Sequence, residues 1–258
     1  MRFLTVKVAA ALIALMCAAS GSAQDTGRAM LASPDQAAWN AVGRLTVQAQ
    51  GFCTATAIAP DIVLTAAHCV VDKRKGGTVD AARVHFVAGM RADTHLASAG
   101  ATEVLITPGF DMRARDIASD IALVILDRAL PDTVRPIALD FGARADRPFT
   151  LVSYGIDRSR ILSVESGCRL DQEIGGVLVT DCEGVPGVSG APLLQVADGV
   201  LSIAGVASAV VRTRSSSVVR GPVLASATSR PWLHARAREG RRLAQADIEV
   251  RPVARDGS

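Results

Sequence analysis

The stretch CTATAIAPDIVLT, residues 53–65, indicates the fold class of this chain. Two runs of strand length occupy Cys53–Ala59 and Ile62–Thr65, and the turn formers Pro60 and Asp61 separate them. Short runs rich in β-branched residues and broken in this way are typical of strands in a sandwich or barrel. We therefore expect both runs to be β-strands.

Runs of the same kind recur along the rest of the chain, in two groups on either side of a proline-containing connector. Many short strands with turn residues between them predict an all-β fold made of two barrels. The sequence Ser-Arg-Pro at 229–231 predicts the start of a helix that closes the domain. The other predicted strands are Arg44–Gln50, Arg83–Ala88, Ala101–Thr107, Ile121–Leu126, Phe149–Tyr154, Gly176–Thr180, Pro192–Val196, Val200–Ala209 and Ser217–Ser226.

The beginning of the chain is typical of a cleavable export signal. Arg2 and Lys7 precede the apolar run Val8–Ala19, and small residues end at Ala23. The apolar run is too short to span a bilayer comfortably, so we expect cleavage after Ala23 rather than a stable membrane anchor. The product would be secreted or periplasmic, and the sequence leaves that choice open.

The predicted organisation follows from these features. It comprises a signal peptide (1–23), an N-terminal extension (24–38), a first β-barrel (39–130), a connector (131–147), a second β-barrel (148–228), a C-terminal helix (229–244) and a flexible tail (245–258).

Net charge argues against a nucleic-acid partner. The formal charge of +3 comes from the two ends, because the first 23 residues carry +2, residues 228–258 carry +3 and the body between them carries −2. Aromatic residues make up 3% of the chain, which leaves few rings for bases to stack on. Protein or peptide substrates remain the expected partners.

Cysteine usage agrees with export. Removal of the signal would leave Cys53, Cys69, Cys168 and Cys182, an even number that fits two disulfides in an oxidising compartment. Three pairings are possible, of which the sequential one is simplest. No CxxC pair is present, so we expect no metal site.

Three short motifs carry the residue types needed for acyl transfer by a serine. TAAHC contains His68, SDIALV contains Asp120 and PGVSGAP contains Ser189. A serine hydroxyl is a weak nucleophile until a base removes its proton, and an imidazole held by a carboxylate is a suitable base. These residues are the predicted catalytic groups, and the chemistry needs no cofactor.

The surroundings of Asp120 and Ser189 support this interpretation. Asp120 begins an apolar run, where a carboxylate needs a partner for its charge, and the His68 ring would serve. Gly187 and Gly190 flank Ser189 closely and allow a sharp turn. We expect the amides of Gly187 and Ser189 to face the developing oxyanion.

The three motifs resemble those of the chymotrypsin/trypsin superfamily, in that family's order of His, Asp and Ser. The resemblance extends from about Trp39 to Leu233, and GFCTAT resembles the strand before the histidine. It implies two antiparallel six-stranded β-barrels with the active site between them and a C-terminal α-helix. It also implies a disulfide between Cys53 and Cys69, and a role for Ser208 in supporting the triad aspartate.

The resemblance is stronger to bacterial trypsin-like peptidases related to the glutamyl endopeptidases. Val188 stands where the animal digestive members carry an aspartate that pairs with a new N-terminus. We therefore expect activation without such an internal salt bridge.

Residues around the expected specificity pocket leave the substrate open. Ala207 stands where glutamyl-specific relatives carry a histidine, which argues against glutamate. Ala209 and Val210 stand where many relatives carry an aromatic residue and a glycine, and a valine there would narrow the pocket and favour small aliphatic residues. Glu183, six residues before Ser189, would favour arginine or lysine if it lined the pocket floor.

The expected function is a secreted serine endopeptidase that works through an acyl-enzyme. A protease-like binding module without activity is one alternative. A serine esterase of the α/β-hydrolase type is another, since GVSGA is close to the nucleophile-elbow pattern. That fold would need Asp198 and His234 as triad partners, and alternating strands and helices.

Overall fold

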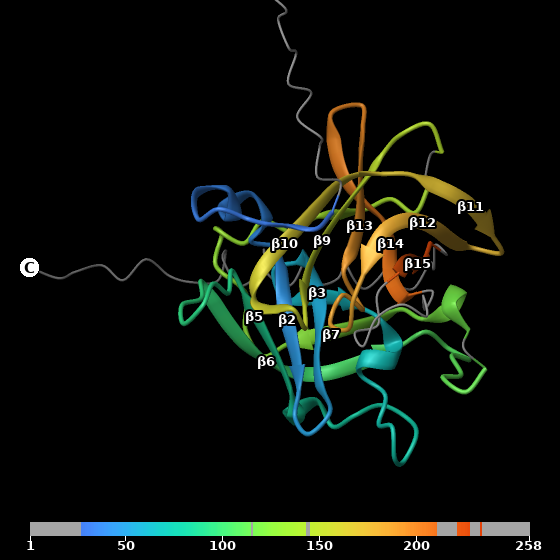
Figure 1. The fold of residues 1–258 in the computed structure, drawn as a ribbon. Coiled ribbons are helices and arrows are strands. Elements are labelled where there is room, and N and C mark those ends of the chain that lie inside the picture. Colours follow the sequence, from blue (N-terminus) through green and yellow to red (C-terminus); the bar gives the residue numbers. More distant parts are fainter. Residues whose placement is uncertain (1–26, 115, 143–144, 211–220, 228–232, 234–258) are drawn as a thin grey trace, which may run out of the picture.

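The chain is described by a computed structural model that covers residues 27–114, 116–142, 145–210, 221–227 and 233. Within these residues β-strands dominate and the helices are short 3-10 turns, so the all-β prediction is confirmed (Figure 1).

Several predicted segments fall outside the described residues. They are the signal peptide, the flexible tail and all of the predicted C-terminal helix except Leu233, whose side chain is buried. Among the described residues, no helix has the length and apolar character needed to cross a membrane.

The first half of the described chain forms a closed barrel of six strands, in the order β2-β3-β4-β7-β6-β5. The stretch 53–65 forms most of the antiparallel pair β3–β4 of this barrel, in which Ala57 lies opposite Val63. Gly43 lets the Phe86 ring fill the interior, because a Cβ at Gly43 would lie 2.4 Å from that ring. The strands are β2 (Val42–Val47), β3 (Gly51–Ala59), β4 (Ile62–Thr65), β5 (Val84–Ala88), β6 (Ala97–Ile106) and β7 (Ala122–Leu126).

The second half forms a curled antiparallel sheet in the order β1-β10-β9-β13-β14-β15-β12-β11, with β8 beside β14. It is the second unit of the expected two-barrel architecture, and within the described residues its strands form a half-barrel. The strands are β1 (Ala29–Met30), β8 (Ala138–Leu139), β9 (Phe149–Gly155), β10 (Arg158–Cys168), β11 (Leu170–Ile174), β12 (Val177–Gly184), β13 (Pro192–Ala197), β14 (Val200–Val210) and β15 (Gly221–Ser226).

Strands β10 and β11 were not expected from the sequence. The register of β10 against β9 shifts twice, between Arg158 and Ser163 and again between Ser166 and Cys168. Such bulges disturb the two-residue alternation by which a strand is recognised. In addition, β10 buries the polar side chains of Ser163 and Glu165, so apolar residues alone do not mark its inner face.

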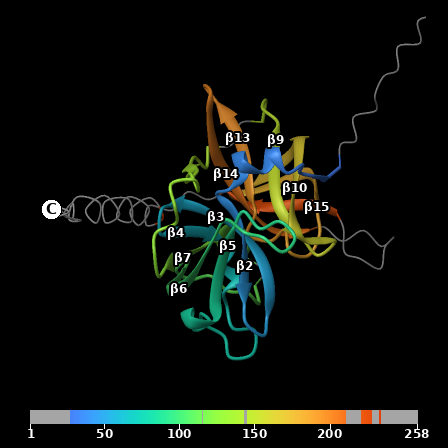
Figure 2. The same ribbon diagram turned by 90° about the vertical axis from the view of Figure 1, so that its left-hand side faces the viewer.

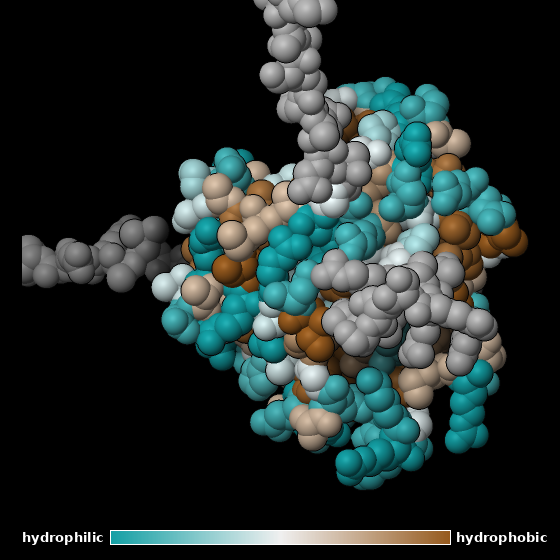
Figure 3. Space-filling view, in the orientation of Figure 1, coloured by the Kyte–Doolittle hydropathy of each residue, from teal (hydrophilic) through white to brown (hydrophobic). Residues whose placement is uncertain are grey.

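The two units contact each other along β3 and β9. The amide of Tyr154 donates a 3.0 Å hydrogen bond to Oγ1 of Thr54, and the amide of Thr54 donates to the carbonyl of Ser189 at 2.8 Å. Figure 2 shows the second sheet above the first barrel with this junction between them. On the face seen in Figure 3, hydrophilic side chains surround separate groups of apolar ones.

Candidate active site

His68 lies in the short 3-10 turn Ala67–Cys69 that follows β4. Its ring Nδ1 is 2.6 Å from Oδ2 of Asp120, and its backbone amide donates to Oδ1 at 2.8 Å. An ionised carboxylate can only accept, so Nδ1 carries the proton and Nε2 is left as the basic nitrogen. The two contacts fix both the position and the tautomer of the ring.

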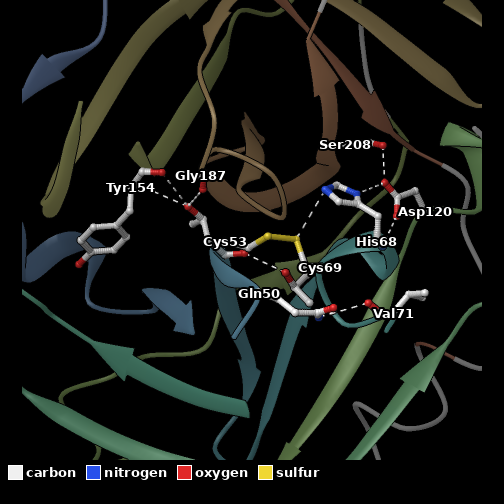
Figure 4. Close-up of a disulfide and its surroundings, with 11 residues drawn as sticks. Gln50, Cys53, His68, Cys69, Val71, Asp120, Tyr154, Gly187 and Ser208 are labelled. Atoms are coloured by element: carbon white, nitrogen blue, oxygen red, sulfur yellow. Dashed lines mark hydrogen bonds and ion pairs between the residues drawn. A yellow bond between two sulfur atoms is a disulfide. The ribbon is translucent and has the colours of Figure 1, made fainter. Parts of the chain in front are cut away.

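Asp120 ends the turn Ile117–Ser119 just before β7 and is 3% exposed. The hydroxyl of Ser208, on β14 of the other unit, donates to the same Oδ2 that faces His68 (Figure 4). A carboxylate removed from water in this way needs several donors, and hydrogen bonds to a charged group contribute about 1.5–3 kcal/mol each. The three donors satisfy the buried carboxylate and hold it beside the imidazole.

A disulfide between Cys53 and Cys69 ties β3 to the turn that carries His68 (Figure 4). Sγ of Cys69 lies 3.8 Å from Nε2 of His68. The second disulfide joins Cys168 to Cys182. The cysteines are therefore paired sequentially, the simplest of the three possibilities that the sequence left open.

Ser189 lies between β12 and β13 on a backbone held from two sides. The Ser189 carbonyl accepts from the amide of Thr54 at 2.8 Å, and the next amide, of Gly190, donates to the carbonyl of Ala207 at 2.6 Å. Gly190 has φ +81° and a Cβ there would lie 2.1 Å from the Thr54 carbonyl, so this close approach requires glycine.

The amides of Gly187 and Ser189 both lack an acceptor among the described residues. Gly187 has φ +97°, and its carbonyl accepts from Oγ1 of Thr54 at 2.9 Å, which fixes the orientation of the loop. These two backbone N–H groups, two residues apart on a fixed loop, can stabilise an oxygen that gains negative charge.

Three cavities surround these groups. One, of about 210 Å³, is lined by His68, Cys69, Gly187 and Ser189 among others, so His68 and Ser189 border the same space. Within the described residues the Ser189 hydroxyl and His68 are not hydrogen-bonded to each other. In enzymes without bound substrate, the hydrogen bond between a nucleophile and its base is often long, and it shortens when substrate binds.

The second cavity, which we call the groove, has a volume of about 660 Å³ and lies between the two units. Phe110 and Met112 line it together with His68 and Asp120. Neither Phe110 nor Met112 was expected from the sequence, since both lie in a loop without a strand pattern.

The third cavity, which we call the small pocket, has a volume of about 70 Å³. Glu183 is not among its lining residues, and the amide of Glu183 donates to Oε2 of Glu165 at 2.8 Å. The lining residues are Val185, Pro186, Val188, Ser189, Ala207, Ser208, Ala209 and Val210.

Two further polar groups support the Ser189 loop and were missed in the sequence. The guanidinium of Arg28, 6% exposed, contacts the carboxylate of Asp157 at 3.1 and 3.2 Å. Asp157 follows Ile156, whose amide donates to the carbonyl of Pro186 at 2.7 Å, directly before Gly187. No local pattern links residues 129 positions apart, so only pairing of β1 with β10 reveals this contact.

Comparison with known proteins agrees with this architecture. A solved structure of a Glu endopeptidase in complex with MPD has a TM-score of 0.64 and 23% sequence identity, covering 86% of this chain and 98% of that one. The protease Anisep from Arthrobacter nicotinovorans has a TM-score of 0.58 and 15% identity, covering 72% and 89%. Among curated protein sequences, none matches this chain.

The sequence also matches the family model described as Trypsin over residues 31–232. That match spans both units and all three motifs. The chain therefore belongs to the trypsin family of serine peptidases.

Proposed function

We propose that this protein is a secreted serine endopeptidase in which Ser189 is the nucleophile, His68 the general base and acid, and Asp120 the group that orients His68. The bond cleaved is a peptide bond of a protein or peptide substrate. Membership of the trypsin family and the geometry around His68 support this assignment.

The reaction follows from the positions of these groups. Nε2 of His68 takes the hydroxyl proton of Ser189 while Oγ bonds to the substrate carbonyl carbon. Collapse of the tetrahedral intermediate breaks the C–N bond, the leaving amine takes the proton from His68, and an ester on Ser189 remains. A water molecule then gives a proton to His68 while its oxygen attacks the ester carbon. The C–O bond to Ser189 breaks, His68 returns the proton to Oγ, and the acid is released.

Charge develops at two places during attack, and each has a counterpart in the site. The carbonyl oxygen becomes negative, and the amides of Gly187 and Ser189 can donate to it; loss of one such donor typically costs 10²–10³-fold in rate. The imidazole becomes positive, and Asp120, held by the Ser208 hydroxyl, stabilises it.

The single observation that carries the proposal is the double contact of His68 with a carboxylate that is 3% exposed. The esterase alternative lacks such support. Asp198, its required acid, lies in the tip of the β13–β14 hairpin with a side chain 85% exposed, 3.6 Å from Arg147. The fold is also all-β rather than alternating.

Labelling with a fluorophosphonate tests the proposal, because the probe phosphonylates only a serine activated by a base. We expect the wild-type protein to be labelled at Ser189 and Ser189→Ala not to be labelled. His68→Ala should lower the labelling rate at least about 10³-fold. His85→Ala, on the exposed side of β5, is the matched control and should label at the wild-type rate.

A folded wild-type protein that resists the probe would support the binding-module alternative and overturn the proposal. Export is tested separately. The N-terminal residue of the mature protein should be Gln24, and the four mature cysteines should resist alkylation until they are reduced.

A further inference from the structure

We infer that the enzyme cleaves after small aliphatic residues, of the size of alanine or valine, and discriminates against arginine, glutamate and aromatic residues at that position. The inference deepens the proposed function and rests on it. It depends on the side of Ser189 that holds the acyl part of the substrate, and on the volume and chemistry of the space there.

The direction of the substrate follows from the position of His68. This residue must protonate the leaving amine, so the leaving part lies in the cavity of about 210 Å³ on the side of His68 and the Cys53–Cys69 disulfide. The acyl part therefore lies on the opposite side of Ser189. The small pocket opens there, and it shares Ser208, Ala209 and Val210 with the groove.

The small pocket is therefore the space for the side chain of the residue whose carbonyl is attacked. Its volume of about 70 Å³ is one third of that of the cavity beside the Cys53–Cys69 disulfide, which is about 210 Å³. A small aliphatic side chain suits a space of this size better than arginine or phenylalanine, whose side chains have seven heavy atoms each.

Val210 forms part of the wall of this pocket. Its Cγ1 lies so close to the backbone of β12 that a Cβ added at Gly184 would be 2.0 Å from it. A Val223 methyl group would lie 2.9 Å from the same point. The two valines therefore pack against the backbone of Gly184, which fixes the position of Val210 in the wall of the small pocket.

The chemistry of the wall excludes charge. Among the described residues the pocket is lined by apolar side chains and the hydroxyl-bearing Ser189 and Ser208, with no ionisable side chain. Glu183, which would have selected basic residues, is not part of this wall. Among the described lining residues no side chain could pair with the charge of a buried arginine or glutamate, and an unpaired buried charge costs far more free energy than a misfitted methylene.

The test uses peptide amides that differ only in the residue before the scissile bond. We expect kcat/KM for alanine or valine to exceed that for phenylalanine, arginine and glutamate at least about 100-fold. Val210→Ala removes the methyl groups that close the pocket, and should raise the ratio of leucine to alanine cleavage at least about 10-fold. Val200→Ala, at the 59%-exposed start of the same strand, is the matched control and should leave the ratio unchanged.

The outcomes separate this inference from the proposed function. If the fluorophosphonate labels Ser189 but arginine or glutamate substrates are cleaved best, the inference is wrong and the proposed function stands. The same holds if Val210→Ala and Val200→Ala change the leucine-to-alanine ratio equally. If the folded protein is not labelled and cleaves none of the peptides, the proposed function fails and the inference fails with it.

Discussion

Glu165 offers a quantitative test of the structure, because a buried carboxyl group ties folding to pH. It is 5% exposed on β10, and Oε2 accepts the amide of Glu183 at 2.8 Å. Burial raises the pKa of Glu165 from 4.5 to about 7, and the nearby Asp181 and Glu183 add to the rise, while the Glu183 amide and the Arg28 charge oppose it. Replacing Glu165 by glutamine keeps an acceptor for the amide and removes the titration.

The direction in which pH changes the free energy of unfolding depends on how many protons the native and unfolded states bind. Below pH 4.5 both the native and the unfolded carboxyl groups are protonated, so burial has no ionic cost. Between pH 4.5 and about 7 the unfolded chain loses its proton first, and the free energy of unfolding falls as the pH rises. Above pH 7 the native state carries a buried negative charge and the loss is complete.

The size of this loss in the free energy of unfolding follows from the native and unfolded pKa values of Glu165. One pKa unit is worth about 1.4 kcal/mol, so the interval from 4.5 to about 7 corresponds to about 3.5 kcal/mol at most. Solvent screening of the carboxylate reduces this to about 1–2 kcal/mol. For a domain of this size that corresponds to about 2–8 °C in Tm.

The assay is thermal unfolding at pH 4 and pH 8.5, carried out in a Ser189→Ala background to prevent self-digestion. We expect Glu165→Gln to match its parent at pH 4 and to melt about 2–8 °C higher at pH 8.5. Glu173→Gln, on the exposed strand β11, makes the same chemical change and should alter neither value. A Glu165→Gln difference that is equal at the two pH values would refute the reasoning.

Two other substitutions test the site and its support. Asp120→Asn should lower kcat about 10⁴-fold with little change in Tm, because the amide no longer holds His68 in the required tautomer; near-normal turnover would contradict the assigned role. Arg28→Met should lower the free energy of unfolding by about 1.5–3 kcal/mol, since it removes a partly buried charge-assisted contact with Asp157, which keeps Arg158 as a partner. The matched change Arg160→Met, at a side chain 57% exposed, should cost under about 1 kcal/mol, and equal losses for the two variants would contradict the argument.

The small pocket, our proposed specificity pocket, shows where reasoning from sequence stops. Glu183 and Val210 each predicted a different substrate, and nothing in the order of residues could choose between them. The choice depends on which side chains line a space of about 70 Å³, and this depends on how β12 and β14 pack against each other. Spacing along the chain does not carry that information.

The sequence by itself determined the all-β class, since strand alternation and turn residues are local properties of the chain. It also pointed to His68, Asp120 and Ser189, because the chemistry of each residue type is readable in its motif. Tertiary structure alone decided the pairing of Cys168 with Cys182, the partly buried contact of Arg28 with Asp157, the bulged strand β10 and the separation of Glu183 from the pocket. These depend on contacts between residues far apart in the chain, which packing of the two units creates and no local pattern encodes.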